Sequence, residues 1–318
     1  MPSITGTLSN MARPETTRQV PPALRYEPAT RARLERSRRA GQVVRVRPGV
    51  YLPLPTGEGH ARRREAEVLA SVRGVVERLA TSYWLSHETA ALLWGCWTWR
   101  LGRLVHVTQL ANPSVRRDSD PATRRHWTAL PERDRHDLDG IPVTSLERTV
   151  VDCARSLRPS SALVVADSAL RLGADVRLLD QILDESAGKR GVIQARQVLQ
   201  LADARSESPG ETLVRWFALD AGLPPLVPQF CVKTWRGEFR LDLAWPELRV
   251  GLEFDGVVKY AGGMGDPAGR LLAEKKREDA LREAGWTILR VTWEDLKDPE
   301  RLVGRLRAAR RLARERAR

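Results

Sequence analysis

The sequence predicts a multi-domain α/β protein, and three features carry that prediction. The chain has 318 residues, which is enough for about two or three domains of ordinary size. Its centre holds several amphipathic, helix-like segments, whereas apolar residues alternate along residues 239–256 as they do in paired β-strands. We expect a disordered polar leader over residues 1–23, a basic unit over 24–60, a mainly helical middle domain over 61–200 and an α/β sheet domain over 208–318.

The composition is that of a strongly basic globular protein. Hydrophobic residues make up 42% of the chain and charged residues 29%, which lies in the globular range. The formal net charge is +13, and most of the excess is arginine. Because the guanidinium group binds phosphate in a forked geometry, nucleic acid is the expected partner. A soluble, arginine-rich surface without a specific partner is the alternative.

Targeting and redox signals point to the cytoplasm. The sequence has no run of the ~18–20 apolar residues that cross a bilayer and no apolar signal-peptide core at its start, so we expect no membrane partner. Cys96, Cys153 and Cys231 are far apart, odd in number and set among apolar residues, which argues against a disulfide framework or a zinc site. The five histidines are scattered without a close pair at ligand spacing.

Residues 24–60 predict a winged-helix-like unit. The basic helix TRARLERSRRAG ends at Gly41 and is followed by QVVRVRPGVYLP, in which strands Val43–Val46 and Val50–Leu52 flank an RPGV turn. A basic helix followed directly by a short hairpin is how a winged helix-turn-helix ends. Its arginines would reach phosphates or guanine edges, unless they form only a solvated basic face. The candidate DNA-binding residues are Arg31, Arg33, Arg36, Arg38 and Arg39 on the helix and Arg45 and Arg47 on the wing.

The middle of the chain predicts mostly packing elements. SHETAALLWG reads as a buried helix capped by Ser86, LVHVTQ and IPVTS as strands, and SLERTVVDCARSL and ALVVADSALRLG as amphipathic helices. We interpret His87 and Trp94 as packing residues and Asp152 as a structural partner of Arg148 one helical turn earlier. ADARSESPG reads as a linker.

The last segment predicts a small sheet with helices on its faces. A helix begins at SPGE, with Ser208 as N-cap, Pro209 at the first position and Glu211 at the third. A strand at Phe230–Thr234, the hairpin of residues 239–256, the helix RLLAEKKREDALREAG, the strand WTILRVTW and a basic terminal helix follow. That terminal helix would either lie on DNA or fray as a basic tail.

Three acids fall on one face of the hairpin. If PELR is the turn, Asp242 faces Glu253 across the ladder and Asp255 shares their face, together with Ala244 and Gly251. Like charges opposite each other destabilise a sheet unless something positive lies between them. Carboxylates that hold Mg²⁺ or Mn²⁺ meet that requirement, and the two small residues leave space for an ion. An exposed acidic sheet face is the alternative.

These motifs resemble the very-short-patch-repair-like branch of the PD-(D/E)XK nucleases. SPGETLVRWFALDAG, RLDLAWPELRVGLEFDG and EKKREDALREAGWTILRVTWEDL carry the resemblance, over about residues 208–297. It implies a restriction-endonuclease-like fold, with Asp242 as the second motif and Glu253 in the third. Asp255 stands where that family has lysine, so Lys276 or Lys259 would supply the positive charge.

The resemblance also implies phosphodiester hydrolysis by a metal-activated water, with Glu211 as a further carboxylate ligand. Glu211 is equally explained by the capping box alone. Arg215, one turn further along, would pair with Glu211 or with phosphate.

The N-terminal half resembles AbiEi-type antitoxins of type IV toxin–antitoxin systems. TRARLERSRRAGQVVRVRPGVYLP, YWLSHETAALLWG, LVHVTQ and GIPVTSLERTVVDCAR carry this resemblance over about residues 24–172. It implies DNA binding, repression of the protein's own promoter and a cognate toxin. The leading hypothesis is therefore a DNA-binding protein with a Mg²⁺-dependent endonuclease domain. The rival is a non-catalytic antitoxin-like repressor whose nuclease fold only grips DNA or a partner, and an RNA-processing nuclease is a third interpretation.

Overall fold

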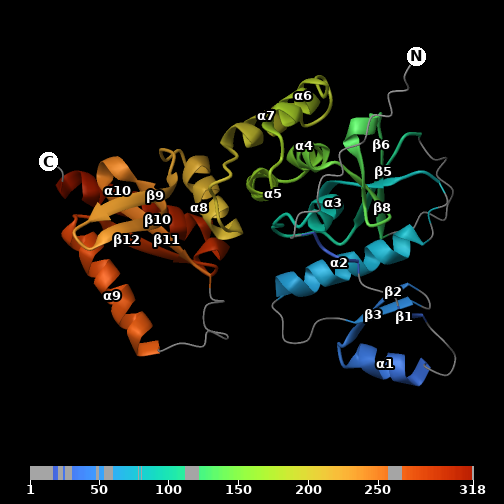
Figure 1. Cartoon of the computed structure of the whole chain (residues 1–318), viewed down its shortest axis with the longest axis horizontal. Coiled ribbons are helices and arrows are strands. Elements are labelled where there is room, and N and C mark those ends of the chain that lie inside the picture. The colour runs from blue at the N-terminus through green and yellow to red at the C-terminus, as the bar shows by residue number, and fades with distance from the viewer. Residues whose placement is uncertain are drawn as a thin grey trace, which may run out of the picture. The chain divides into compact units, whose positions relative to one another are not determined.

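The chain folds into two compact units that both combine helices with sheets. The computed structural model describes residues 17–20, 24–25, 31–47, 50–53, 60–77, 79, 81–111, 122–256 and 267–316 (Figure 1). The N-terminal unit comprises residues 1–155 and 174–190, and the C-terminal unit comprises residues 156–173 and 191–318. The predicted multi-domain α/β class is thus confirmed at this level. Within the described ranges, no helix is both long and apolar enough to span a membrane.

The basic helix and hairpin form where the sequence places them. β1 (Leu24–Arg25), α1 (Arg31–Arg39), β2 (Val43–Arg47) and β3 (Val50–Pro53) give an antiparallel sheet in the order β1-β3-β2. Gly41 ends the helical segment with a positive φ of 69°, a conformation that glycine adopts without steric cost. Leu34, Val43 and Tyr51 form the small core beneath α1.

The rest of the N-terminal unit surrounds a five-stranded mixed sheet, in the order β6-β5-β4-β8-β7. Its strands are β4 (Trp84–Leu85), β5 (Val105–Gln109), β6 (Thr123–Trp127), β7 (Arg135–Leu138) and β8 (Ile141–Thr144). Its helices are α2 (His60–Val76), α3 (His87–Leu93), α4 (Leu146–Ser156) and α6 (Val176–Asp184). Most residues of this middle region lie in helices, and it also contains two polar strands that the sequence did not predict, β6 (TRRHW) and β7 (RHDL), which lack apolar alternation.

A buried ion network fixes α4 against this sheet. Arg148 donates to Asp152 at 2.9 Å and to Asp134 at 3.1 Å, and all three side chains are at most 5% exposed. Burial alone would lower the pKa of Arg148, but attraction to Asp152 and bonds to both carboxylates raise it overall. The structural pairing predicted for Asp152 is confirmed.

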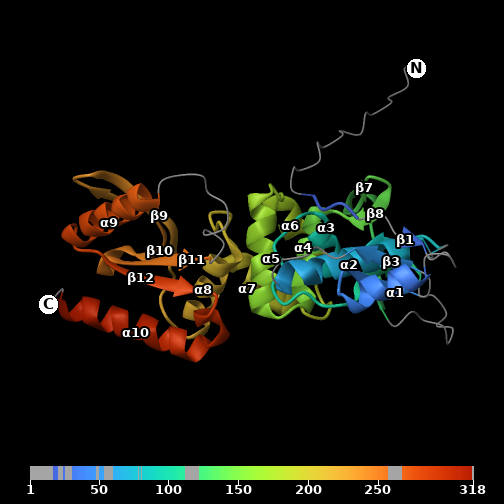
Figure 2. The ribbon, with the colours of Figure 1, turned by 90° about the horizontal axis from the view of Figure 1, so that it is seen from below.

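The C-terminal unit contains a four-stranded sheet, in the order β12-β11-β10-β9. The strands are β9 (Val227–Thr234), β10 (Gly237–Trp245), β11 (Val250–Asp255) and β12 (Thr287–Thr292), and only β11 and β12 run parallel among these four. Helices α5 (Pro159–Arg171), α7 (Val192–Leu201), α8 (Pro209–Asp220), α9 (Pro267–Glu283) and α10 (Pro299–Arg316) complete the described part of the unit. Figure 2 shows α9 and α10 on opposite faces of the sheet. The predicted order of elements from α8 onward is confirmed.

The predicted linker is held in place by a buried ion pair. Asp167 of α5, fully buried, accepts from Arg215 of α8 at 2.9 Å and from the Asp203 amide at 2.8 Å. Arg215 also donates to Ser206, within the segment expected to be a linker. Burial raises the pKa of Asp167, and the nearby Arg215 opposes that rise. Arg215 is therefore buried against Asp167, so it is the partner neither of Glu211 nor of a phosphate at the surface. Both α5 and α7 belong to the C-terminal unit.

Two glycines let elements approach closely around this sheet. A Cβ on Gly210, in the first turn of α8, would lie 2.1 Å from a ring carbon of Phe254 on β11. A Cβ on Gly251 would lie 2.6 Å from Leu241 and 2.9 Å from Ile288. Side chains larger than hydrogen are therefore excluded at both positions unless the neighbouring groups move.

Candidate functional site

The hairpin forms in the predicted register. Leu243 pairs with Leu252 and Trp245 with Val250. Continuing this antiparallel register by one residue places Asp242 opposite Glu253. The turn is a short 3-10 segment, Pro246–Leu248. The carboxylate of Asp242 nevertheless bends into the backbone of the next strand, because its Oδ2 accepts a hydrogen bond from the Phe254 amide at 2.7 Å.

Glu253 is paired with an arginine that the sequence did not suggest. Arg277 of α9 forms an ion pair with Glu253, and the two side chains are 22% and 13% exposed. Arg277 also lies 3.6 Å from Glu274 and donates to the backbone oxygen of Arg240 at 3.2 Å. Burial would lower the pKa of Arg277, but its bond to Glu253 and the charges of Glu253, Glu274 and Asp242 raise it. The positive charge between the acids is therefore a guanidinium group.

The two predicted lysines do not supply that charge in the described structure. Lys276 is exposed, so the expectation that it points toward the sheet is wrong. The buried face of α9 runs through Ala280 and Leu281, whereas Ala273 is exposed. This orientation of the helix brings Arg277, and not Lys276, to Glu253 on the sheet. Lys259 lies outside the described residues.

Glu211 behaves mainly as the capping residue that its position suggests. Its amide donates to the Ser208 hydroxyl at 3.2 Å, and its carboxylate accepts from Ser208, from the Glu207 amide and from Gln229 at 2.8–2.9 Å. Burial raises the pKa of Glu211, and Asp242 adds to that rise, so the two acids lie within electrostatic reach.

Gln229 was missed by the sequence reasoning. It has a left-handed φ of 53°, a strained conformation that is uncommon outside glycine. It donates to Glu211, while its own Oε1 is buried without a hydrogen-bond partner in the described part of the chain. No local pattern in VPQFCVKT signals either property.

The arrangement observed gives no support for a Mg²⁺ ion at these residues. Within the described ranges, the one group of three potential metal ligands that converge consists of histidines and not of acids. The space expected beside Ala244 and Gly251 is filled by Leu241 and Ile288. Asp255, at the end of β11, is half-buried and pairs in the ladder with Thr292.

The α1 arginines remain on the surface, with one partly neutralised. Arg33, Arg36, Arg38 and Arg39 are exposed, and Arg38 forms an ion pair with Glu35 at 3.0 Å. The bond from Arg38 lowers the pKa of Glu35. The structure places the backbones of Arg31 on α1 and of Arg45 and Arg47 on β2, and their side chains lie outside its description.

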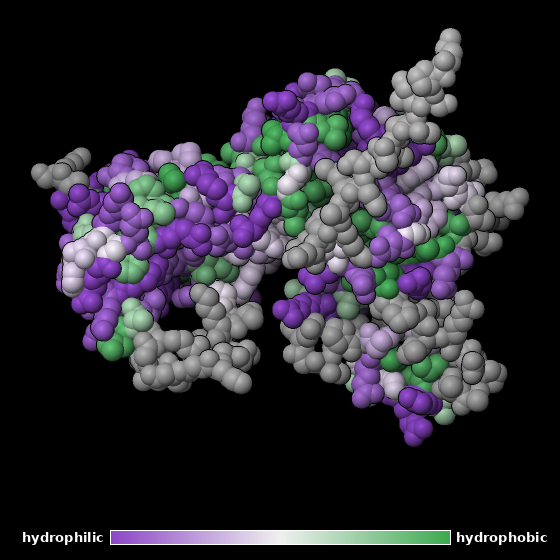
Figure 3. Space-filling model, in the orientation of Figure 1, coloured by the Kyte–Doolittle hydropathy of each residue, from purple (hydrophilic) through white to green (hydrophobic). Residues whose placement is uncertain are grey.

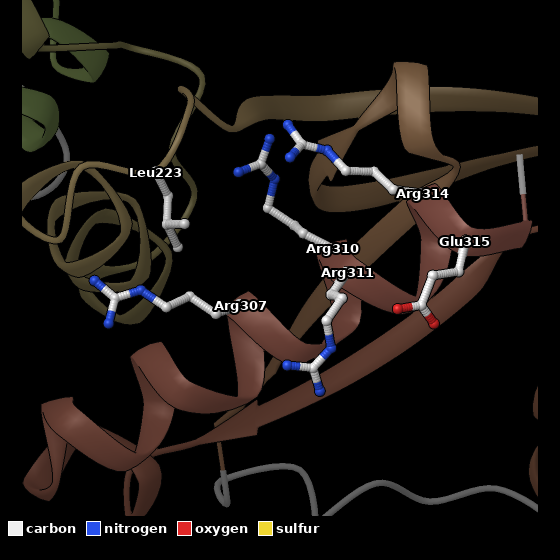
Figure 4. A pocket seen from close by; sticks show the side chains of 6 residues that line it. All are labelled: Leu223, Arg307, Arg310, Arg311, Arg314 and Glu315. Carbon is white, nitrogen blue, oxygen red and sulfur yellow. The ribbon is translucent and has the colours of Figure 1, made fainter. Parts of the chain in front are cut away.

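Arginines also surround a cavity beside α10. The cavity has a volume of about 330 Å³ and is lined by Leu223, Arg307, Arg310, Arg311, Arg314 and Glu315. Figure 4 shows the four guanidinium groups extending from successive turns of α10. Figure 3 shows that hydrophilic residues cover much of the visible face of the C-terminal unit. Leu302, Leu306 and Ala313 are buried, so α10 is a packed helix through residue 316 and not a fraying tail.

Arg310 is the least solvated member of this arginine cavity. Its guanidinium lies 5.0 Å from the centre of the Trp245 ring, and its Nε is buried with no hydrogen-bond partner among the described atoms. Burial lowers the pKa of Arg310, Arg314 lowers it further, and Glu247 opposes both effects. An anion that entered the cavity would offset this repulsion.

Three of the five histidines, expected to be scattered, lie together in the N-terminal unit. The potential ligand atoms of His87, His106 and His126 all lie within 4.8 Å of one another. His87, expected to be a packing residue, stacks on His126 with ring centres 3.8 Å apart. Burial lowers the pKa of all three, that of His106 to about 3. Trp94 is a packing residue as predicted, with its indole N–H bonded to the Thr144 oxygen at 2.9 Å.

Comparisons with known proteins leave the family of the chain open. No family model and no solved structure matches it. Two uncharacterized proteins of Mycobacterium tuberculosis, MT2308 from strain CDC 1551 / Oshkosh and Rv2248 from strain H37Rv, are each 36% identical to it over 172 residues. The match covers 53% of this chain and 62% of each relative.

Proposed function

We propose that the chain is a DNA-binding protein whose C-terminal unit contacts the phosphate backbone through the arginine cavity of α10. The observation that carries the proposal is the composition of that cavity: four of its six lining residues are arginines and one is acidic. Phosphate oxygens are the acceptors that a guanidinium fork matches best. The exposed arginines of α1 would form a second contact, as expected of the helix in a winged-helix-like unit.

The cavity is suited to an anion because its cations repel each other and are poorly compensated. Arg314 destabilises the charged form of Arg310, and the Arg310 Nε lacks an acceptor within the described structure. A phosphate group in the cavity would offer acceptors to the surrounding guanidinium groups. Its charge would also relieve the repulsion between neighbouring guanidinium groups.

The acidic face of the hairpin supports binding in preference to cleavage. Glu253 is paired with Arg277, Asp242 is bonded to the Phe254 amide, and Glu211 is occupied by its capping contacts. These contacts engage carboxylate oxygens that a catalytic ion would otherwise use. They favour the non-catalytic, AbiEi-like repressor over the endonuclease.

The test is equilibrium binding of duplex DNA by the full chain over a range of salt concentrations. We expect the triple variant Arg310→Ala, Arg311→Ala and Arg314→Ala to bind at least ~10-fold more weakly at low salt. Each lost phosphate contact should lower the slope of log K against log salt by about 0.9.

A matched triple variant removes the same charge elsewhere on the unit. Arg236, Arg282 and Arg301 are exposed, and replacing them with alanine should leave most of the slope intact. Equal losses in both triple variants would show that overall basicity, and not the cavity, governs binding.

One observation favours a metal-dependent nuclease as the second candidate. Asp242 lies close enough to raise the pKa of both Glu211 and Arg277, so three acids and one arginine gather at the end of the hairpin. Plasmid cleavage with Mg²⁺ or Mn²⁺ tests it, with Asp242→Asn as the inactive control and Arg277→Ala to release Glu253. If neither the parent nor Arg277→Ala cuts DNA, the nuclease is excluded and the binding protein remains.

A further inference from the structure

The histidine cluster joins three elements of the N-terminal unit. His106 lies on β5, His126 on the adjacent parallel strand β6, and His87 at the first position of α3. Nδ1 of His106 and Nε2 of His126 are 3.2 Å apart. A tetrahedral ion with metal–nitrogen bonds of about 2.0–2.1 Å holds its ligand nitrogens about 3.3–3.4 Å apart. Two of the three imidazoles therefore already have the spacing of metal ligands.

The third imidazole needs only a local adjustment. All three potential ligand atoms lie within 4.8 Å of one another, so the longest spacing must shorten by at most about 1.5 Å to match a tetrahedral ion. His87 stacks on His126 with an 18° angle between the rings, and rotation of the His87 ring would aim its nitrogen at the same point. His87 is itself strained, with a φ of 53°, which is typical of residues placed for a function.

A polar group lies near the second nitrogen of two of these imidazoles. The Ser86 hydroxyl makes no capping bond to α3, although Ser86 occupies the N-cap position; it lies 3.0 Å from Nδ1 of His87. The Glu88 carboxylate lies 4.0 Å from Nε2 of His106, on the side of that ring away from His126. Metal-binding histidines commonly use their second nitrogen in this way. The arrangement leaves Nε2 of His87, Nδ1 of His106 and Nε2 of His126 for a metal.

We propose that His87, His106 and His126 form a binding site for one divalent transition metal ion of the zinc class. Imidazole nitrogens are ligands that Zn²⁺ and Co²⁺ bind well, whereas Mg²⁺ prefers oxygen. Three protein ligands leave a coordination position for water or an anion, the pattern of reactive rather than structural zinc sites. His126 is half-buried and provides the approach from solvent. All three histidines belong to the N-terminal unit, and the proposal does not rest on the proposed DNA binding.

The first experiment uses the full chain without a histidine tag, stripped of metal with EDTA. Titration with Co²⁺ should saturate at one equivalent and give the intense visible absorption of a four-coordinate ion, which one equivalent of Zn²⁺ should abolish. X-ray absorption at the zinc edge should show imidazole nitrogens at about 2.0–2.1 Å. Absence of saturable binding by either ion would overturn the proposal, because the cluster would then be only a packed group of neutral rings.

Two histidine variants separate the site from nonspecific binding. His126→Gln should lower the Zn²⁺ affinity by at least ~100-fold, and Ser86→Ala by ~10–100-fold, as expected for loss of an orienting partner. His136→Gln is the matched control, because His136 packs against Trp94 with ring centres 4.9 Å apart and lies outside the cluster. Equal affinity of His126→Gln and His136→Gln would refute the assignment. Circular dichroism of each metal-free variant checks that it folds, and the absorption experiments on the parent chain decide the question if a variant does not.

Discussion

Replacing Gly210 with alanine should destabilise the C-terminal unit, although the same change usually stabilises a helix. Gly210 lies in the first turn of α8, where the Phe254 ring packs directly on it. The added Cβ would lie 2.1, 2.2 and 2.4 Å from three ring carbons. Since carbon atoms in contact are separated by about 3.5–4.0 Å, the ring or the helix must move by well over 1 Å.

The magnitude follows from the opposing terms. Overpacking a well-packed site costs typically about 1–3 kcal/mol. The Phe254 ring is also restrained by Trp293, which packs against it in a T-shaped arrangement with ring centres 4.9 Å apart. Removing the backbone freedom of glycine returns at most ~1 kcal/mol. We therefore expect Gly210→Ala to lower the free energy of unfolding by about 1–2 kcal/mol.

Gly304→Ala provides a control with the opposite expected sign. Gly304 lies inside α10, and a Cβ added there meets nothing within 4 Å, so the substitution should stabilise by about 0.5–1 kcal/mol. Urea unfolding followed by tryptophan fluorescence measures both variants, with unchanged m-values as the condition for comparing them. If Gly210→Ala proves as stable as Gly304→Ala, α8 does not pack closely on Phe254. The positions of Glu253 and Asp255, the neighbours of Phe254 on β11, would then also be wrong.

Three further outcomes are expected. Asp167→Ala should cost about 3–5 kcal/mol of unfolding free energy in urea, because it leaves Arg215 buried without its partner. Alkylation of the native protein at pH 8, read by mass spectrometry, should modify exposed Cys231 and spare buried Cys96, since burial raises the pKa of Cys96 to about 12. Acidifying the metal-free protein from pH 7 to 5 should lower its free energy of unfolding by about 2 kcal/mol through His106 alone. The pKa of His106 is about 3 in the folded protein and 6.5 in the unfolded chain. Below pH 6.5 the unfolded chain therefore takes up a proton that the folded protein does not, and this favours unfolding.

Local patterns were sufficient where neighbours in sequence decide the structure. α1, β2 and β3 lie within a residue or two of their predicted bounds, because Gly41 and the Pro-Gly pair of the RPGV motif are strong sequence signals for where an element stops. The pairing of Leu243 with Leu252 follows from the apolar alternation on both strands and the short turn. Both features depend on contacts between residues close in the chain.

Sequence reasoning failed where pairing between distant segments decides the result. His87, His106 and His126 meet only because polar strand β6 pairs with β5, and β6 lacks the alternation that would reveal it. The sequence pattern favoured Lys276, although Arg277, the next residue, supplies the positive charge. Few apolar residues of α9 are buried, so the sequence does not reveal which face of the helix packs on the sheet. Cys231, expected in an apolar setting, is exposed on β9.

The choice of arginine at position 277 bears on whether the acidic face can ever hold a cation. A guanidinium group keeps its proton at any physiological pH, so Glu253 stays neutralised unless another anion draws Arg277 away. DNA phosphate is such an anion, since it also accepts the guanidinium fork. Binding of Mg²⁺ to the free protein should therefore be undetectable at this face, and Arg277→Ala should be the variant in which it first appears. Calorimetric titration of both proteins with Mg²⁺, without DNA, distinguishes an acid cluster that Arg277 blocks from one that cannot bind the ion at all. If neither protein binds Mg²⁺, the acid cluster is not a metal site.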